Sequence, residues 1–224
     1  HMPLLDDYLK AFAERPGIKV VCELKVHTDK RREAKAVKKV LKLMKRHKLT
    51  DRAVYITFSP EATREFVKHA PKGTEVYYLN GNWTPQQLKD EGCAGADYNL
   101  KVMQKHPEWI EQCHNLGLKV NIWTVNRRDD LQWCIDHGAD VVYGHGPHVA
   151  RAIEVYKGRF IGYSLGNFCT PYNVSLTGIS GYAPLVEIQT DRKGRFLGGQ
   201  IHSMAQERGQ GPRLDKAHRA AQEI

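Results

Sequence analysis

The sequence lacks the features that mark membrane proteins and disulfide or zinc scaffolds. No apolar run approaches the about 20 residues of a membrane helix, and the N-terminus has no signal-peptide pattern. The five cysteines are irregularly spaced without a Cys-x-x-Cys pair, which argues for reduced thiols in a cytosol-like compartment. We expect a soluble protein without a membrane partner. His1-Met2 resembles a tag remnant, so the localisation itself is left unassigned.

Apolar and basic residues are abundant. The 224 residues are 41% hydrophobic, as in a globular chain that can bury a substantial core. The formal net charge of +9 is concentrated between Lys30 and Lys48, where basic residues surround an apolar stripe. This spacing predicts an amphipathic helix with a solvated basic face. Nucleic acid is a less favoured partner, because no aromatic residues and no DNA- or RNA-binding signature accompany the basic residues.

Strand-like apolar runs alternate with helical stretches from Ile18 to about His145. This alternation predicts consecutive β-α units on a parallel sheet. Roughly six strands are expected where a closed barrel needs about eight, so the barrel is partial. The expected strands cover residues 18–26, 53–58, 75–79, 96–99, 119–125 and 140–144, and the expected helices cover residues 30–47, 60–69, 85–91, 107–116 and 130–137.

After Val149 the pattern changes to antiparallel hairpins joined by short turns. The predicted fold class is therefore α/β: a partial β/α barrel of consecutive β-α units continued by antiparallel hairpins into a mixed sheet. The change in pattern places a seam at Asp140–Pro147, between segments 1–142 and 143–224, which we expect to pack as one compact unit. The hairpins are expected at residues 153–156 with 160–165 and 185–190 with 195–204, and residues 212–224 form a basic tail ending in a short helix.

Four stretches of the first segment carry recognisable motifs. Together they resemble the glycerophosphodiester phosphodiesterases over roughly residues 3–142. That family is a TIM barrel that hydrolyses glycerophosphodiesters with a divalent metal. The stretches that carry the resemblance are Pro3–Leu9, Val21-Cys22-Glu23-Leu24-Lys25, Tyr55-Ile56-Thr57-Phe58-Ser59 and Val120-Asn121-Ile122-Trp123-Thr124-Val125-Asn126.

The resemblance assigns roles to three residues. It implies that Glu23 binds the metal, that Lys25 faces the phosphate as a catalytic group, and that Trp123 lines the substrate pocket. Residues two apart on a strand share a face, and the C-terminal ends of barrel strands point at the active-site mouth. An ordinary strand ion pair between Glu23 and Lys25 is the alternative. The family's His-Arg-Gly, Glu-x-Asp and His-Asp motifs are absent, so we expect no diesterase activity of the parental kind.

The second segment carries different motifs. In sequence they resemble the capsule-synthesis (poly-γ-glutamate) branch of calcineurin-like metallophosphoesterases, over about residues 141–210. The resemblance implies that His145 and His148 bind metal at a two-metal phosphoesterase site. That family's earlier ligand motifs are absent, so a residual pair of loop histidines is the alternative. The matching stretches are Gly144-His145-Gly146-Pro147-His148-Val149, Ile153-Glu154-Val155-Tyr156-Lys157-Gly158 and Tyr163-Ser164-Leu165-Gly166-Asn167-Phe168.

The seam raises the hypothesis of a hybrid site. Glu23, His145 and His148 could form a carboxylate and two-histidine cluster that suits Zn²⁺ or Mn²⁺. The favoured interpretation is a chimeric or recombined protein that folds without parental catalysis. The alternatives are a metal-dependent phosphodiesterase or phosphatase with a rebuilt site, acting on a small phosphoester, and a basic nucleic-acid-binding protein. The cofactor is then Mn²⁺, Mg²⁺, Ca²⁺ or Zn²⁺, or none. The exposed edge of the first strand could be covered by the hairpins after Val149 or by a second chain, so a homodimer is one of two expectations.

Overall fold

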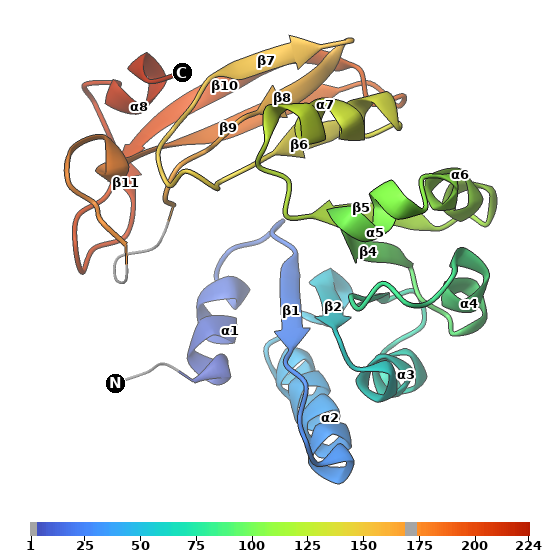
Figure 1. Ribbon diagram of the computed structural model, residues 1–224. Coiled ribbons are helices and arrows are strands. Elements are labelled where there is room, and N and C mark those ends of the chain that lie inside the picture. The colour runs from blue at the N-terminus through green and yellow to red at the C-terminus, as the bar shows by residue number, and fades with distance from the viewer. Residues whose placement is uncertain (1–3, 169–173) are drawn as a thin grey trace. The chain divides into compact units, whose positions relative to one another are not determined.

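The computed structural model describes residues 4–168 and 174–224, which form two compact units. Unit 1 ends at Trp123 and unit 2 begins at Thr124 (Figure 1). The described cysteines are all free thiols, whereas Cys169 and Pro3 lie outside the described residues. Within the described ranges no helix is both long and apolar enough to span a membrane. The cytosol-like compartment stays a prediction.

Unit 1 is an open, five-stranded parallel sheet whose strands follow one another in chain order. Its strands are β1 (Val20–Leu24), β2 (Ala53–Thr57), β3 (Glu75–Tyr78), β4 (Gly95–Asn99) and β5 (Lys119–Trp123). Its helices are α1 (Leu5–Ala13), α2 (Lys30–Arg46), α3 (Pro60–His69), α4 (Pro85–Asp90), α5 (Leu100–Lys105) and α6 (Glu108–Asn115), with a 3-10 turn, η1, at Thr50–Arg52. The predicted α/β class and the partial β/α series are confirmed (Figure 1).

The core of unit 1 fills the space between the sheet and its first helices. Tyr55 of β2 and Phe66 of α3 are fully buried and stack with ring centroids 4.4 Å apart. Helix α2 buries Val37 and Met44 completely, and Asp29 caps its N-terminus by accepting hydrogen bonds from two backbone N–H groups. The apolar stripe predicted from the sequence therefore packs into the core.

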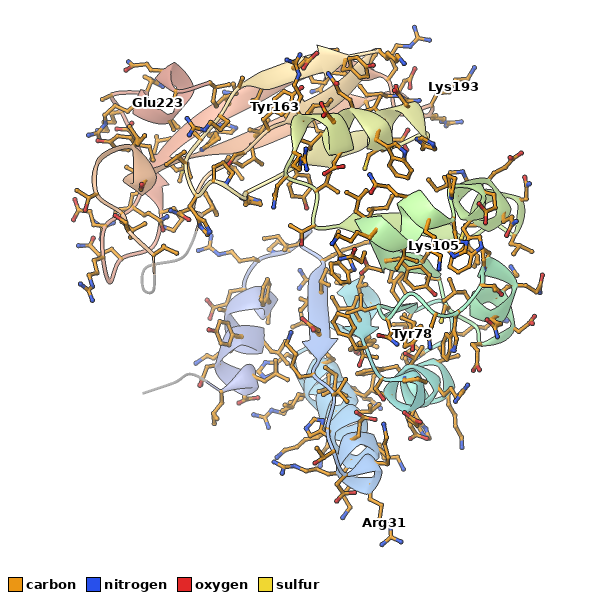
Figure 2. The ribbon with its side chains drawn as sticks, viewed as in Figure 1. Arg31, Tyr78, Lys105, Tyr163, Lys193 and Glu223 are labelled. Atoms are coloured by element: carbon orange, nitrogen blue, oxygen red, sulfur yellow. The ribbon has the colours of Figure 1, made fainter. Side chains whose placement is uncertain are left out.

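The basic face of α2 is solvated, as the sequence predicts. Figure 2 shows side chains projecting from α2, with Arg31 at its N-terminal end pointing away from the helix. Lys30 and Arg46 pair with carboxylates, at 2.8 Å from Glu61 and 2.8 Å from Asp6. The basic residues between them are exposed and make no ion pair within the described residues. Nucleic acid as a partner is untested.

Unit 2 contains two three-stranded sheets. One has the order β6-β8-β7 and the other β11-β10-β9. The strands are β6 (Val141–Tyr143), β7 (Ile153–Tyr156), β8 (Arg159–Gly162), β9 (Tyr182–Thr190), β10 (Phe196–Ala205) and β11 (Arg213–Leu214), and the helices are α7 (Arg128–Asp136), α8 (Arg219–Gln222) and the 3-10 turn η2 (Gly178–Gly181). Tyr163, labelled in Figure 2, follows β8 and donates its hydroxyl hydrogen to Glu154 of β7.

Contrary to the sequence prediction, the hairpins do not continue the parallel sheet into one mixed sheet, because the described strands form three separate sheets. Strand β6 does not join the parallel sheet of unit 1; it pairs in parallel with β8, which pairs antiparallel with β7. Ion pairs reinforce this arrangement, because Asp136 of α7 lies 2.7 Å from Lys157 and Asp140 lies 2.7 Å from Arg159. The last strand of the β-α series is therefore held by the hairpin that follows it.

Edge strand β1 has β2 as its only neighbour in the sheet of unit 1. Its residue Val21 is 60% exposed. An edge strand presents unpaired backbone groups that can pair with another chain. The predicted homodimer, the packing of the two segments as one unit and the seam itself stay predictions.

Candidate functional site

The inner face of the unit 1 sheet follows from strand register. Glu23 of β1 lies opposite Ile56 of β2, which lies opposite Tyr77 of β3. On the next pair of strands, Asp97 lies opposite Asn121. Because side chains alternate along a strand, these residues share one face, whereas Val20 and Leu24 point into the helical core.

Glu23 and Lys25 form a close pair on this face. The Lys25 ammonium lies 2.6 Å from a carboxylate oxygen of Glu23, and the two side chains are 77% and 29% exposed. This is the ion pair that the sequence left as the alternative. An exposed pair of this kind contributes little to stability, so both groups are accessible to a ligand. Their metal-binding and phosphate-facing roles stay predictions.

Trp123 is fixed at the C-terminal end of β5. Its indole N–H donates to the backbone carbonyl of Asp97 at 2.9 Å, and its ring meets Phe58 edge to face with centroids 5.8 Å apart. These contacts hold the indole beside the strand ends of unit 1. The role of Trp123 in lining a substrate pocket stays a prediction.

Asp97 is a candidate that the sequence interpretation missed. Burial raises the pKa of its carboxyl to about 6, and the negative charge of Glu23 contributes to the same shift. A carboxyl group that titrates near neutral pH is a common property of functional sites. The signal in the sequence was the alternation in Gly95–Asn99, which places Asp97 on the opposite face from buried Ala96 and Tyr98.

We expect Asp97→Asn to stabilise the protein by about 2 kcal/mol at pH 7 and to leave its stability unchanged near pH 4. Since the folded-state pKa is raised from 3.8 to about 6, the folded state binds this proton more tightly. The resulting stability is complete below the unfolded-state pKa and is lost as the pH rises through about 6. Urea unfolding at both pH values measures it.

Asp90→Asn, at an exposed site on α4, provides the control. We expect it to have a small effect at either pH, because its carboxylate is already in water. Equal stabilisation by Asp97→Asn at pH 4 and pH 7 would contradict the assigned titration.

In unit 2, each of the two predicted histidines has one ring nitrogen held by an acceptor. Nδ1 of His145 lies 3.0 Å from the carbonyl oxygen of Gly166. Nδ1 of His148 lies 2.7 Å from Oδ1 of Asn167, whose amide nitrogen donates back to the His148 carbonyl at 2.8 Å. Because these partners accept, each neutral ring carries its proton on Nδ1 and leaves Nε2 with a free lone pair. This is the arrangement typical of metal-binding histidines.

The loop that carries these histidines is tightly constrained. His148 has a φ of 59°, in the left-handed region that non-glycine residues rarely adopt. A Cβ atom at Gly146 would lie 2.5 Å from Cγ of Asn126, so a side chain at that position would collide with the asparagine. The sequence Gly-His-Gly-Pro-His therefore suits a sharp turn packed closely against Asn126.

The donor set fits part of a metal site. Two imidazole Nε2 atoms suit Zn²⁺ or Mn²⁺, but a catalytic zinc site usually has about three protein ligands. Across residues 4–168 and 174–224, no three His, Cys, Asp or Glu side chains gather as a group that could hold a metal ion. The hybrid cluster would join Glu23 of unit 1 to two histidines of unit 2, and it stays a prediction.

Comparison with known proteins finds two different likenesses. A family described as bacterial capsule synthesis protein PGA_cap matches residues 114–172. The PGA biosynthesis protein CapA of Bacillus subtilis (strain 168) is 64% identical over 33 residues, which are 15% of this chain and 9% of that protein. The family match begins before the seam, within α6, so it includes residues that the sequence interpretation assigned to the first segment.

Solved structures resemble a larger part of the chain. A glycerophosphodiester phosphodiesterase from Parabacteroides distasonis ATCC 8503 is 40% identical, with a TM-score of 0.59, over 62% of this chain and 58% of that one. A putative glycerophosphoryl diester phosphodiesterase from Silicibacter pomeroyi DSS-3 is 25% identical, with a TM-score of 0.55, over 62% and 52%. The chain thus spans little more than half of these structures. The two likenesses are consistent with a chimera of glycerophosphodiester phosphodiesterase and capsule-synthesis sequences.

Proposed function

We propose that this chain is a chimera of two phosphoesterase-derived segments that folds but does not catalyse the reaction of either parent. The observation that supports this most directly is the division of the site residues. Glu23 and Lys25 lie in unit 1, whereas His145 and His148 lie in unit 2. In the roles that the resemblances imply, each pair would be only a small part of a phosphoesterase site.

The remaining groups are too few for the parental chemistry. Glu23 and Asp97 are carboxylates on the inner face of the unit 1 sheet, and two carboxylates fall short of the about 6–8 oxygen ligands of Ca²⁺. Two imidazoles also fall short of the about three protein ligands of a catalytic zinc site. The close pairing of Lys25 with Glu23 further reduces the positive charge available to a phosphate.

A second candidate function is metal-dependent phosphoester hydrolysis at a rebuilt site. The observation that favours it is the Nδ1 hydrogen bond of each histidine, which leaves both Nε2 atoms available. In this candidate His145, His148 and Glu23 hold the ion, and Lys25 stabilises negative charge on the phosphoryl group. A bound divalent ion would polarise the phosphate and lower the pKa of water. Trp123 would contact the organic part of the substrate.

One experiment separates the two candidates. Hydrolysis of bis-p-nitrophenyl phosphate is measured with Mn²⁺, with EDTA, and in a Glu23→Ala, His145→Ala variant. We expect background rates in all three. Glu111→Ala, His114→Ala is the matched control, since it removes the same residue types from exposed positions on α6. Chelator-sensitive turnover that the first variant loses and the control keeps would contradict the proposal and support the rebuilt site.

A further inference from the structure

A hollow lies at the end of the unit 1 sheet opposite Glu23 and Lys25. Its volume is about 650 Å³, within the range of small-molecule sites. Its lining includes Ala53 at the start of β2, Glu75 at the start of β3, and Lys19, which precedes β1. Lys48, Thr50–Arg52 and Pro71–Thr74 complete the lining. In a parallel sheet these are the amino-terminal strand ends, so the hollow is distinct from the predicted phosphoester site.

Positive charge predominates in this hollow. The lining includes four cationic side chains and the two carboxylates Asp51 and Glu75. Glu75 is already neutralised, because Lys19 lies 2.7 Å and Lys119 3.0 Å from its carboxylate, which also accepts a hydrogen bond from Tyr77 at 2.6 Å. These contacts hold the pKa of Glu75 at about 2, so it stays ionised and paired at neutral pH.

The guanidinium of Arg52 is the most rigid of the cations. It donates to the carbonyl oxygens of Arg15 at 2.6 Å, Ile18 at 3.0 Å and Phe12 at 3.4 Å. Carbonyl groups orient the guanidinium without cancelling its charge. Since a guanidinium has about five N–H donors, these three bonds leave hydrogens on Nε and Nη2 unused. The side chain is thus held in place before any ligand arrives.

Two lysines supply further charge at the rim. Lys48 and Lys72 are exposed and make no ion pair within the part of the chain that the structure describes. Together with Arg52 they outnumber the single unpaired carboxylate, Asp51. Apolar atoms of Ala53 and Pro71 line the same hollow and can contact an organic group.

We propose that this hollow binds a phosphorylated small molecule. A phosphate dianion matches the two lysines and the oriented guanidinium, and its organic part contacts the apolar lining. The small volume favours a compact ligand over a nucleic-acid strand, which needs an extended basic groove. The inference does not rest on the proposed chimera or on a metal.

Phenyl phosphate is the probe, and ¹⁵N-labelled protein in metal-free buffer is titrated with it while backbone amide shifts are followed. We expect saturable shifts at Arg52, Gly73 and Thr74. Lys48→Gln, Lys72→Gln should weaken binding about five-fold, since exposed charges contribute modestly to binding an anion. Lys39→Gln, Lys42→Gln removes the same charge from the exposed face of α2 and should change affinity less than two-fold.

Two outcomes would contradict the proposed site. Equal weakening by both double variants would mean that the basic surface attracts the anion generally, which overturns the site. The absence of saturable shifts in the unmodified protein also overturns it. Binding that survives in Glu23→Ala, Lys25→Ala separates this hollow from the predicted phosphoester site, so the outcome does not depend on whether the chain hydrolyses phosphoesters.

Discussion

Glu33→Ala is expected to lower the free energy of unfolding by about 3 kcal/mol. Glu33 is the only acidic residue within α2, and it is 1% exposed. Its carboxylate accepts hydrogen bonds from the backbone N–H of His27 at 3.0 Å and from the hydroxyl of Ser59 at 2.6 Å. Alanine leaves both donors without this acceptor, and a buried donor without a partner costs about 1–3 kcal/mol. Urea unfolding at pH 7 measures the change.

Two variants test the reason for this loss. Glu33→Gln keeps the size and one acceptor oxygen, so we expect about half the effect. Glu61→Ala removes a carboxylate that also contacts Ser59 and Lys30, at 3.2 and 2.8 Å, but whose side chain is 50% exposed. We expect it to cost less than about 1 kcal/mol. The explanation fails if Glu33→Ala destabilises the protein no more than Glu61→Ala.

In the rebuilt-site candidate, in which His145 and His148 hold the ion, Asn167→Ala should weaken Zn²⁺ binding at least about ten-fold. Asn167 is 3% exposed, and its side chain both accepts from His148 and donates to the His148 carbonyl. Without it, the His148 ring loses the acceptor that fixes the proton on Nδ1, so Nε2 is no longer held ready for a metal. Calorimetric titration with Zn²⁺ measures the affinity.

A second readout separates this role from loss of folding. Asn167→Asp keeps an oxygen acceptor for His148 but loses the amide donor to the His148 carbonyl, so we expect it to retain part of the Zn²⁺ affinity that Asn167→Ala loses. In the metal-free protein, ¹⁵N spectra of the imidazole should show mainly the Nδ1-protonated form in the parent and a mixture in Asn167→Ala. An unchanged tautomer in that variant would refute the positioning role of Asn167.

Most elements of the fold could be predicted because their sequence patterns are local. Helix α3 covers Pro60–His69, the range predicted from the sequence, and Ser59 caps its N-terminus. Helix α5 was missed because it is short, at Leu100–Lys105, and its cap is Asn99, the last residue of a strand. A helix of one or two turns that directly follows a strand is too short to show helical hydrophobic periodicity, so the sequence pattern does not predict it.

The features that the sequence did not predict depend on contacts between residues far apart in the chain. The pairing of β6 with β8 depends on which strand edge is free after folding. Hydrophobic periodicity predicts a strand but not the strand with which it pairs. The burial of the Glu33 carboxylate could not be predicted, because Glu33 lies in a lysine-rich segment and its hydrogen-bond partners lie outside α2. Asn167 belonged to a recognised motif, but its bond to His148, 19 residues away in the sequence, became visible only in the structure.

The placement of β6 has a consequence for how such a chain could arise. The seam predicted from the sequence lies at Asp140–Pro147, but α7 and β6 already belong to unit 2, where Asp136 pairs with Lys157 across that predicted seam. A genetic crossover at the seam therefore falls inside a folding module, not in a linker between modules. Exchange at this point preserves a stable product only when the helix contributed by one ancestor fits the hairpin contributed by the other. Compatibility across this joint, more than the integrity of either parental fold, would then decide which recombinants persist.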